Sequence, residues 1–125
     1  MSAERIRELA VRFFDAIESG DITTVHGIYA DNAVIWHNTD GKEASREENL
    51  RVLEGFIGAV SDRRYTNRRL NVFESGFVEQ HELTGKLANG KTIALAACIV
   101  CTVSNGRITR LDEYFDSAVL ERLRN

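Results

Sequence analysis

The chain has 125 residues, of which 43% are hydrophobic and 28% are charged, and its formal net charge is −3 at pH 7. This length and composition fit one domain over residues 1–125 with a single apolar core. A negative net charge provides no general attraction for phosphate groups, and no apolar run approaches the roughly 18 residues that a membrane-spanning helix needs. We therefore expect a cytoplasmic protein that binds neither nucleic acid nor membranes.

The N-terminal residues predict two helices in succession. Between residues 3 and 19, apolar side chains recur at the spacing of one helix face, and Gly20 provides a stop signal. Asp21 can cap a second, short helix that ends near the polar residues 31 and 32.

A strand and a third helix follow. Residues 33–37 (AVIWH) have the composition of a strand, and residues 38–44 are typical of a turn. Ser45 and Glu48 have the spacing of a capping box, in which each side chain accepts from the backbone N–H of the other residue. They predict the start of a third amphipathic helix, so the first half of the chain has three helices and one strand.

From Arg63 onward, the pattern predicts four long strands. The runs are interrupted at Ser75-Gly76, Asn89-Gly90 and Asn105-Gly106, dipeptides that suit the tight turns of hairpins. Strands of about ten residues or more twist and curl, which leaves the concave side of the sheet to the three helices. The sequence therefore predicts an α+β cone, in which a curved, mainly antiparallel sheet packs against three helices from the N-terminal half.

Two groups of residues could suggest other functions, but their positions argue against it. A cluster of four arginines between residues 63 and 69 has only Tyr65 interleaved, so we expect a solvated edge strand here: Arg63, Arg64, Arg68 and Arg69. Cys98 and Cys101 lie in a strand-like run, where their spacing points them to opposite faces as reduced thiols. The three histidines lack metal-ligand spacing, so we expect no metal site.

Counting through the hairpins predicts a row of polar residues. If the turns at Asn89-Gly90 and Asn105-Gly106 both have two residues, His81, Cys98 and Glu113 lie side by side on three strands. Two strand spacings then separate the imidazole from the carboxyl group by about 10 Å, which is room for a substrate or water.

The same count divides the remaining residues between two faces. A bulge or a three-residue turn would shift the row and bring Gln80 or Glu82 inward instead. The concave face is expected to carry Phe77, Leu83, Ala96, Val100, Leu111 and Phe115. The opposite face is too apolar to remain wholly in water, so we expect a homodimer that packs sheet to sheet. Its residues are Val78, Ile93, Leu95, Ile99, Val103, Ile108 and Tyr114.

Several short segments resemble a known family. Together they are similar to the SnoaL-like branch of the NTF2-like superfamily, and the resemblance covers nearly the whole chain. The segments are Phe13-Phe14-Asp15, Ser19-Gly20-Asp21, Tyr29-Ala30-Asp31-Asn32-Ala33-Val34, Asn105-Gly106-Arg107-Ile108-Thr109-Arg110 and Glu113-Tyr114-Phe115-Asp116. The resemblance implies the fold but not the reaction, because this superfamily includes isomerases, cyclases, hydrolases, dehydratases and non-catalytic domains.

Comparison with the ketosteroid isomerases of this superfamily gives a mixed answer. His37 matches the position of their catalytic aspartate. Phe13 stands where they have an oxyanion tyrosine, and Ile99-Val100 replace their protonated aspartic acid. Because both hydrogen-bond donors to an enolate are missing, ketosteroid isomerase chemistry is not expected.

Comparison with limonene epoxide hydrolases supports only a minor alternative. Glu113 matches one of their catalytic aspartates, but Gln80 and Glu82 fall where that family has an arginine and a second aspartate. Epoxide hydrolysis is therefore a minor alternative.

Polyketide cyclases resemble the chain best in outline, which implies proton transfer at a carbon next to a carbonyl group, without a cofactor. The candidate catalytic residues are His37, His81 and Glu113, acting on a small apolar carbonyl compound. The apolar pocket for it is expected to be lined by Phe13, Phe56, Phe77, Cys98, Val100, Leu111 and Phe115. The alternative is a non-catalytic module that binds an apolar ligand or dimerises.

Overall fold

The computed structural model describes the backbone of residues 1–124 and the side chains of residues 1–119 and 121. In chain order the elements are α1 (Ala3–Ser19), α2 (Ile22–Ile28), β1 (Tyr29–His37), β2 (Glu43–Ser45), α3 (Arg46–Ala59), β3 (Val60–Phe73), β4 (Gly76–Leu87), β5 (Thr92–Ser104), β6 (Arg107–Phe115) and α4 (Ser117–Arg124).

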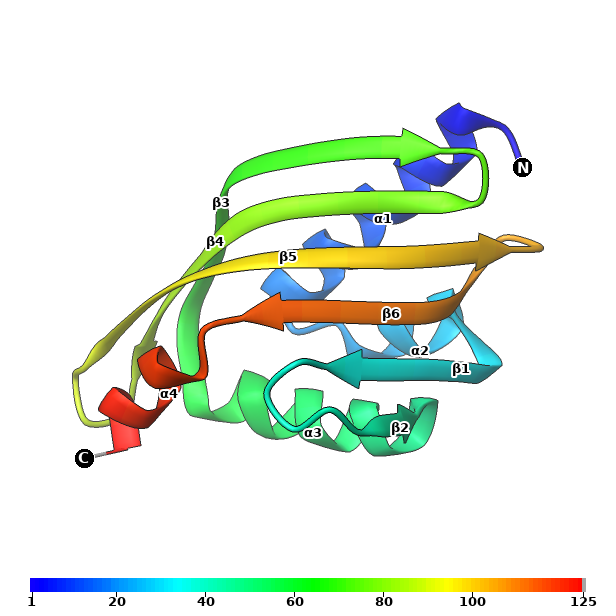
Figure 1. Cartoon of the computed structure of the whole chain (residues 1–125). Helices are drawn as coiled ribbons and strands as arrows, with labels where there is room; N and C mark the ends of the chain where they lie inside the picture. Colours follow the sequence, from blue (N-terminus) through cyan, green and yellow to red (C-terminus); the bar gives the residue numbers. More distant parts are fainter. Residues whose placement is uncertain (125) are drawn as a thin grey trace.

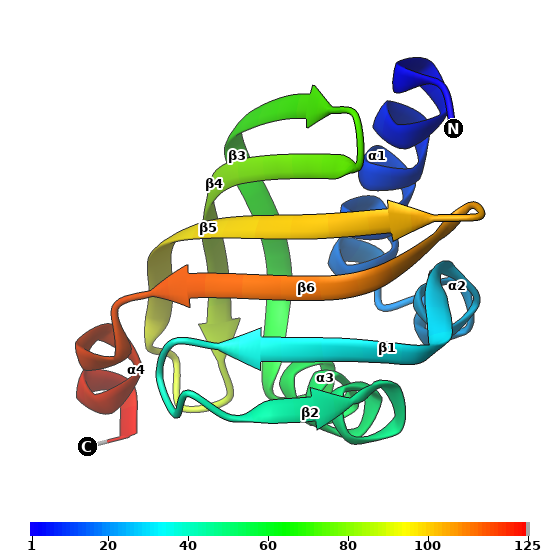
Figure 2. The same cartoon turned by 45° about the vertical axis from the view of Figure 1, so that its right-hand side comes forward.

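The strands form one curved sheet in the order β2-β1-β6-β5-β4-β3. β1 runs parallel to β6, and the other neighbouring strands are antiparallel. β3, β4 and β5 bend strongly, and α1, α2 and α3 cover the concave side of the sheet (Figure 1, Figure 2). The predicted α+β cone with a mainly antiparallel sheet is confirmed.

The caps of the first three helices agree with the sequence. Gly20 ends α1 with a left-handed φ of 81°, and the Asp21 carboxylate accepts from the backbone N–H of Thr24 at the start of α2. The predicted capping box of Ser45 and Glu48 opens α3. Local hydrogen bonding is thus enough to set where these helices begin or end.

Two short elements are missing from the sequence-based prediction. β2 begins within the stretch expected to be a turn and pairs with β1 through Ala44 and Ile35. α4 starts where the Asp116 carboxylate accepts from the N–H of Ala118. Its Val119 packs against a small apolar cluster formed by Val60, Leu83, Ile93 and Leu95. Such short segments are marginal alone, so they depend on their neighbours more than on their own sequence.

The predicted row of His81, Cys98 and Glu113 is wrong. In each of the two hairpins, the observed register differs by one residue from the register obtained by counting through the turns. Between β4 and β5, the N–H of Leu87 donates to the carbonyl of Lys91, so the loop has three residues and His81 pairs with Ala97. The loop at Asn105-Gly106 has two residues, as predicted.

A second shift occurs within the β5–β6 pair. The register changes between Thr102 and Val103, so Cys98 lies opposite Tyr114 instead of Glu113. The two register shifts cancel for β6, whose side chains keep their predicted faces. The side chains of β5, which lies between the shifts, point to the opposite faces from those predicted. Ile93, Leu95, Ile99 and Val103 therefore belong to the buried core, while Ala96, Cys98 and Val100 lie on the convex face. Cys98 and Val100 do not line the concave side as predicted.

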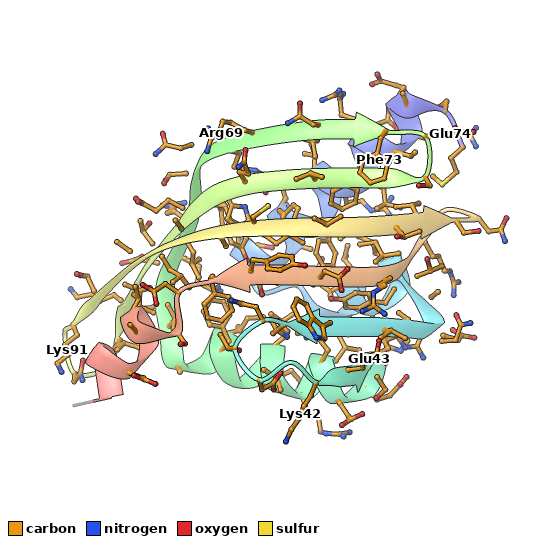
Figure 3. All side chains as sticks on the ribbon, in the orientation of Figure 1. Lys42, Glu43, Arg69, Phe73, Glu74 and Lys91 are labelled. Atoms are coloured by element: carbon orange, nitrogen blue, oxygen red, sulfur yellow. The ribbon has the colours of Figure 1, made fainter. Side chains whose placement is uncertain are left out.

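The arginine cluster of β3 is not wholly solvated, although β3 is the edge strand expected. Two bulges occur at Asp62 and Asn67, which have left-handed φ values of 52° and 54°. Each bulge adds a residue to one strand and changes which side chains face inward. Arg63 and Arg68 are turned to the concave side, where they contact Ile17 and Glu79. Arg69 stays exposed at the edge (Figure 3).

Arg63 joins the ends of two helices to the sheet. Its guanidinium group donates to the carbonyl of Ile17 near the end of α1 and to the carbonyls of Ile57 and Val60 at the end of α3. The last carbonyl groups of a helix have no partner within it, so a cationic donor satisfies them well.

Candidate active site

An imidazole and a carboxylate meet at the ends of β1 and β6. The parallel pairing places His37 beside Glu113, with Nε2 of the imidazole 3.0 Å from Oε1 of the carboxylate. Both side chains lie on the same face as the buried Ile35 and Leu111, which is the concave face. Each is 26% exposed, so the pair is partly desolvated but open to solvent.

Asn38 holds this end of the two strands together. Its backbone N–H donates to the carbonyl of Glu113, and its side-chain amide both donates to and accepts from the backbone of Phe115. These contacts explain why the chain keeps His37 and Glu113 in register just where β1 ends.

The carboxylate changes the charge state of the imidazole. Its hydrogen bond to Glu113 raises the pKa of His37 above the ordinary value of 6.5, while burial acts in the opposite direction. The negative charges of Glu113 and Asp40 add to the increase. His37 therefore remains an imidazolium group over a wider pH range than a free histidine.

A second imidazole–carboxylate pair lies deeper in the cone. Nδ1 of His81 is 2.6 Å from Oε2 of Glu79, and both side chains are only 1% exposed. The guanidinium group of Arg68 approaches the other oxygen of Glu79 at 3.6 Å and forms a 2.8 Å ion pair with Asp15 of α1.

The two pairs are linked by a row of residues across four strands. Glu79 pairs with Ile99, Ile99 pairs with Glu113, and Glu113 pairs with His37. All four side chains face the concave side, and one strand separates the two carboxylates, a span of roughly 10 Å at the backbone. This row replaces the one predicted from the turns.

Aromatic side chains surround the space between the pairs. The ring of Tyr65 lies 4.2 Å from that of His81, and the ring of His37 lies 6.3 Å from that of Phe115. Burial raises the pKa of the Tyr65 phenol, so it stays protonated and able to donate. Phe56, Tyr65 and Phe115 keep some exposure and contact both apolar clusters of the molecule, so they lie where these clusters meet.

The sequence of residues 10–111 matches the family model of the SnoaL-like domain. The chain belongs to the SnoaL-like family. A comparison with curated protein sequences finds no match.

Solved structures similar to this SnoaL-like domain carry several names. AclR of Streptomyces galilaeus, described as a candidate hydroxylase, is 14% identical, with 98% of this chain and 87% of that chain covered and a TM-score of 0.86. A candidate polyketide cyclase of Xanthomonas campestris pv. campestris is 17% identical, with 97% and 95% covered and a TM-score of 0.83. A candidate isomerase of Bacillus subtilis is 15% identical, with 98% and 94% covered and a TM-score of 0.84. At these identities, the likeness shows the fold alone.

The structure brings only part of the predicted site of this SnoaL-like domain together. His37 and Glu113 are in contact, whereas His81 lies with Glu79 in a separate pair. Among the residues expected to line a pocket, three pack fully within the core and two remain partly exposed on the concave side. The buried ones are Phe13, Phe77 and Leu111, and the partly exposed ones are Phe56 and Phe115.

Glu79, Arg68 and Tyr65 are polar residues beside these pairs that the sequence analysis does not select as site residues. Glu79 had a usable signal, because residues two apart on a strand share a face and it precedes His81 by two. Arg68 had none, since its inward direction depends on the bulge at Asn67.

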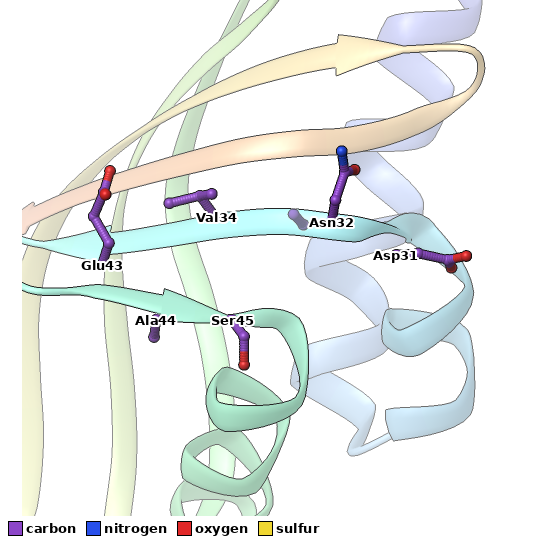
Figure 4. Close-up of a pocket in the computed structure, with 7 residues that line it drawn as sticks. Asp31, Asn32, Val34, Glu43, Ala44 and Ser45 are labelled. Carbon is purple, nitrogen blue, oxygen red and sulfur yellow. The ribbon is translucent and has the colours of Figure 1, made fainter.

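Two of the hollows on the described part of the surface lie away from these pairs. One has a volume of about 310 Å³ and lies between β1 and β2, with Asp31, Val34 and Glu43 among its lining residues (Figure 4). The other lies along the outer side of α1 between Glu4 and Asp15. Neither is lined by His37, His81 or Glu113.

Among the described residues, no cluster of three or more His, Cys, Asp or Glu side chains could hold a metal ion. In the same part of the chain, none of the helices is both long enough and apolar enough to cross a membrane.

Proposed function

We propose that this SnoaL-like domain moves a proton on a small, largely apolar carbonyl compound without a cofactor, as in an isomerase, cyclase or lyase reaction. The observation that carries the proposal is the contact between His37 and Glu113 on the concave face. An imidazole oriented by a carboxylate and partly shielded from water is suited to general acid–base catalysis. The compound would lie against the partly exposed Phe56, Tyr65 and Phe115.

The reaction balances without any further reagent. A base takes the proton from the carbon next to the carbonyl group, and the electron pair of the broken C–H bond moves to the carbonyl oxygen as an enolate. A proton donor returns a proton to the same carbon or to another one, or the enolate expels a leaving group or attacks an electrophilic carbon of the same molecule. His37 takes part in one of these proton transfers, and Glu113 orients its ring.

Deuterium exchange tests this proposal without knowledge of the natural substrate. Cyclic ketones and β-dicarbonyl compounds are incubated with the chain in deuterated water, and deuterium at the carbon next to the carbonyl is followed by NMR. We expect exchange with at least one compound to exceed the buffer rate, and His37→Gln to lower it about 100-fold, the usual contribution of a general acid or base.

His26→Gln is the matched control, because His26 is exposed on α2. It is expected to leave the exchange rate unchanged. Exchange at the buffer rate for every compound, or equal exchange in the two histidine variants, would contradict the proposal.

A non-catalytic ligand-binding module is the second candidate. It is favoured by Phe13 and Ile99, which are buried apolar residues at positions where ketosteroid isomerases are expected to have hydrogen-bond donors. Binding of the same compounds without exchange would support this candidate instead. The epoxide hydrolase alternative loses support, because Gln80 and Glu82 lie on the convex face, away from Glu113.

We also propose that two copies of the chain pack through their convex faces. The outward side chains of the central strand β5 are small or apolar, while the edge strand β3 carries exposed charged residues such as Arg64 and Arg69, which resembles the apolar centre and polar rim of an interface. The outward residues of β5 include Ala94, Ala96, Cys98 and Val100. Light scattering is expected to give twice the chain mass, and Ala96→Glu is expected to halve it. A single-chain mass at every concentration would contradict the dimer.

A further inference from the structure

The contact between Glu79 and His81 limits where the proton of a neutral imidazole ring can lie. An ionised carboxylate only accepts hydrogen bonds, so the 2.6 Å contact with Oε2 of Glu79 requires the proton of the neutral ring to be on Nδ1 of His81. The second ring nitrogen, Nε2, then carries a free lone pair. This is how a carboxylate prepares a histidine to act as a base through its other nitrogen.

Arg68 keeps the Glu79 carboxylate in this role. The bulge at Asn67 turns Arg68 inward, with its Nε 3.6 Å from Oε1 of Glu79. Asp15 anchors the guanidinium group from α1, and Phe14 lies under it at 5.8 Å from the ring centroid. The cation and its two neighbours hold the carboxylate of Glu79 in place beside His81.

The other nitrogen of His81, Nε2, has no hydrogen-bond partner among the side chains that the structure describes. Every fully buried nitrogen or oxygen of those side chains, by contrast, has a partner. Nε2 therefore keeps only slight contact with solvent, because the side chain is 1% exposed and its ring is stacked on Tyr65 and meets the edge of Phe14. A proton can reach it directly or through one water molecule.

We propose that Glu79 and Arg68 are positioning residues that make Nε2 of His81 the proton acceptor of the concave face, opposite the His37–Glu113 pair. The proton of the substrate C–H bond goes to Nε2, the electron pair goes to the carbonyl oxygen, and His37 supplies a proton to that oxygen. His81 and His37 thereby divide the roles of base and acid. This inference rests on the proposed function for its chemistry, but its proton arrangement can be tested separately.

Nitrogen-detected NMR of labelled protein reports which ring nitrogen of each histidine carries the proton. For His81 in the native chain near neutral pH, we expect protonated Nδ1 and unprotonated Nε2. In Glu79→Gln, whose amide can donate as well as accept, we expect both tautomers. The matched control is Glu82→Gln, the neighbouring position on the convex face, which is expected to keep the native signals.

A native His81 protonated on Nε2, or on both nitrogens, overturns the inference, and this result needs no variant. Where the deuterium exchange described above is present, Glu79→Gln is expected to lower its rate about tenfold, while KM and the rate of Glu82→Gln stay unchanged. An unchanged rate in Glu79→Gln also overturns the inference. If the native tautomer is as expected but no compound exchanges, the proposed function fails while the positioning of His81 by Glu79 stands.

Discussion

Replacing Gly76 with alanine is expected to lower the free energy of unfolding by about 3 kcal/mol or more, the upper range for overpacking a filled core. A Cβ atom at this position would lie 1.8 Å from the carbonyl oxygen of Cys101 and 3.1 Å from Cα of Thr102. These are backbone atoms of the paired strand β5, so they cannot move aside as a side chain would. The substitution would separate β4 from β5 just before Phe77 and Glu79.

Urea denaturation followed by circular dichroism measures this loss. Gly55→Ala is the matched control, because Gly55 lies within the exposed side of α3 and a Cβ there has no neighbour within 4 Å. That substitution is expected to raise the free energy of unfolding by roughly 0.5–1 kcal/mol, since alanine favours a helix interior. Equal stability of Gly76→Ala and the native chain would show that the two strands do not approach as closely as described.

Local signals in the sequence predict much of the fold. Gly20, Asp21 and the Ser45–Glu48 box act within a few residues, so they locate helix ends without knowledge of the rest of the molecule. The hairpins could be predicted for the same reason, although not their registers. The loop before Lys91 has three residues, but its Asn-Gly dipeptide is typical of a two-residue turn, so the sequence does not indicate the longer loop.

The candidate site could be predicted only in part, because a register error of one residue reverses a whole strand. Counting through the hairpins therefore turns Cys98 inward, whereas it keeps His81 and Glu113 on one face because the two shifts cancel. The contact of His37 with Glu113 could not be predicted from hairpin counting. It depends on the parallel pairing of β1 with β6, which joins segments far apart in the chain.

Glu113→Gln is expected to cause as large a loss of activity as His37→Gln, since it removes the carboxylate that orients and charges His37. Exchange of deuterium into a responsive carbonyl compound should fall about 100-fold or more, within the usual range for loss of acid–base catalysis. Glu54→Gln, at an exposed position on α3, is the matched control and should exchange at the native rate. Equal rates in these two glutamate variants would exclude a role for the pair.

The same variant also changes how stability depends on pH. The pKa of His37 is raised in the folded chain, so the pair stabilises the fold fully below the unfolded-state pKa near 6.5. This contribution is lost as the pH rises through the raised pKa of the folded state. The free energies of unfolding of the native chain and Glu113→Gln should therefore differ more at pH 5 than at about pH 9.

The most direct test of the concave-face pair is an NMR titration of His37 in the native chain and in Glu113→Gln. The contact predicts a pKa above 6.5 in the native chain and a clear decrease in the variant, where burial acts without the opposing carboxylate. A His37 pKa that is the same in both proteins would contradict the contact and, with it, the site on which the proposed chemistry depends.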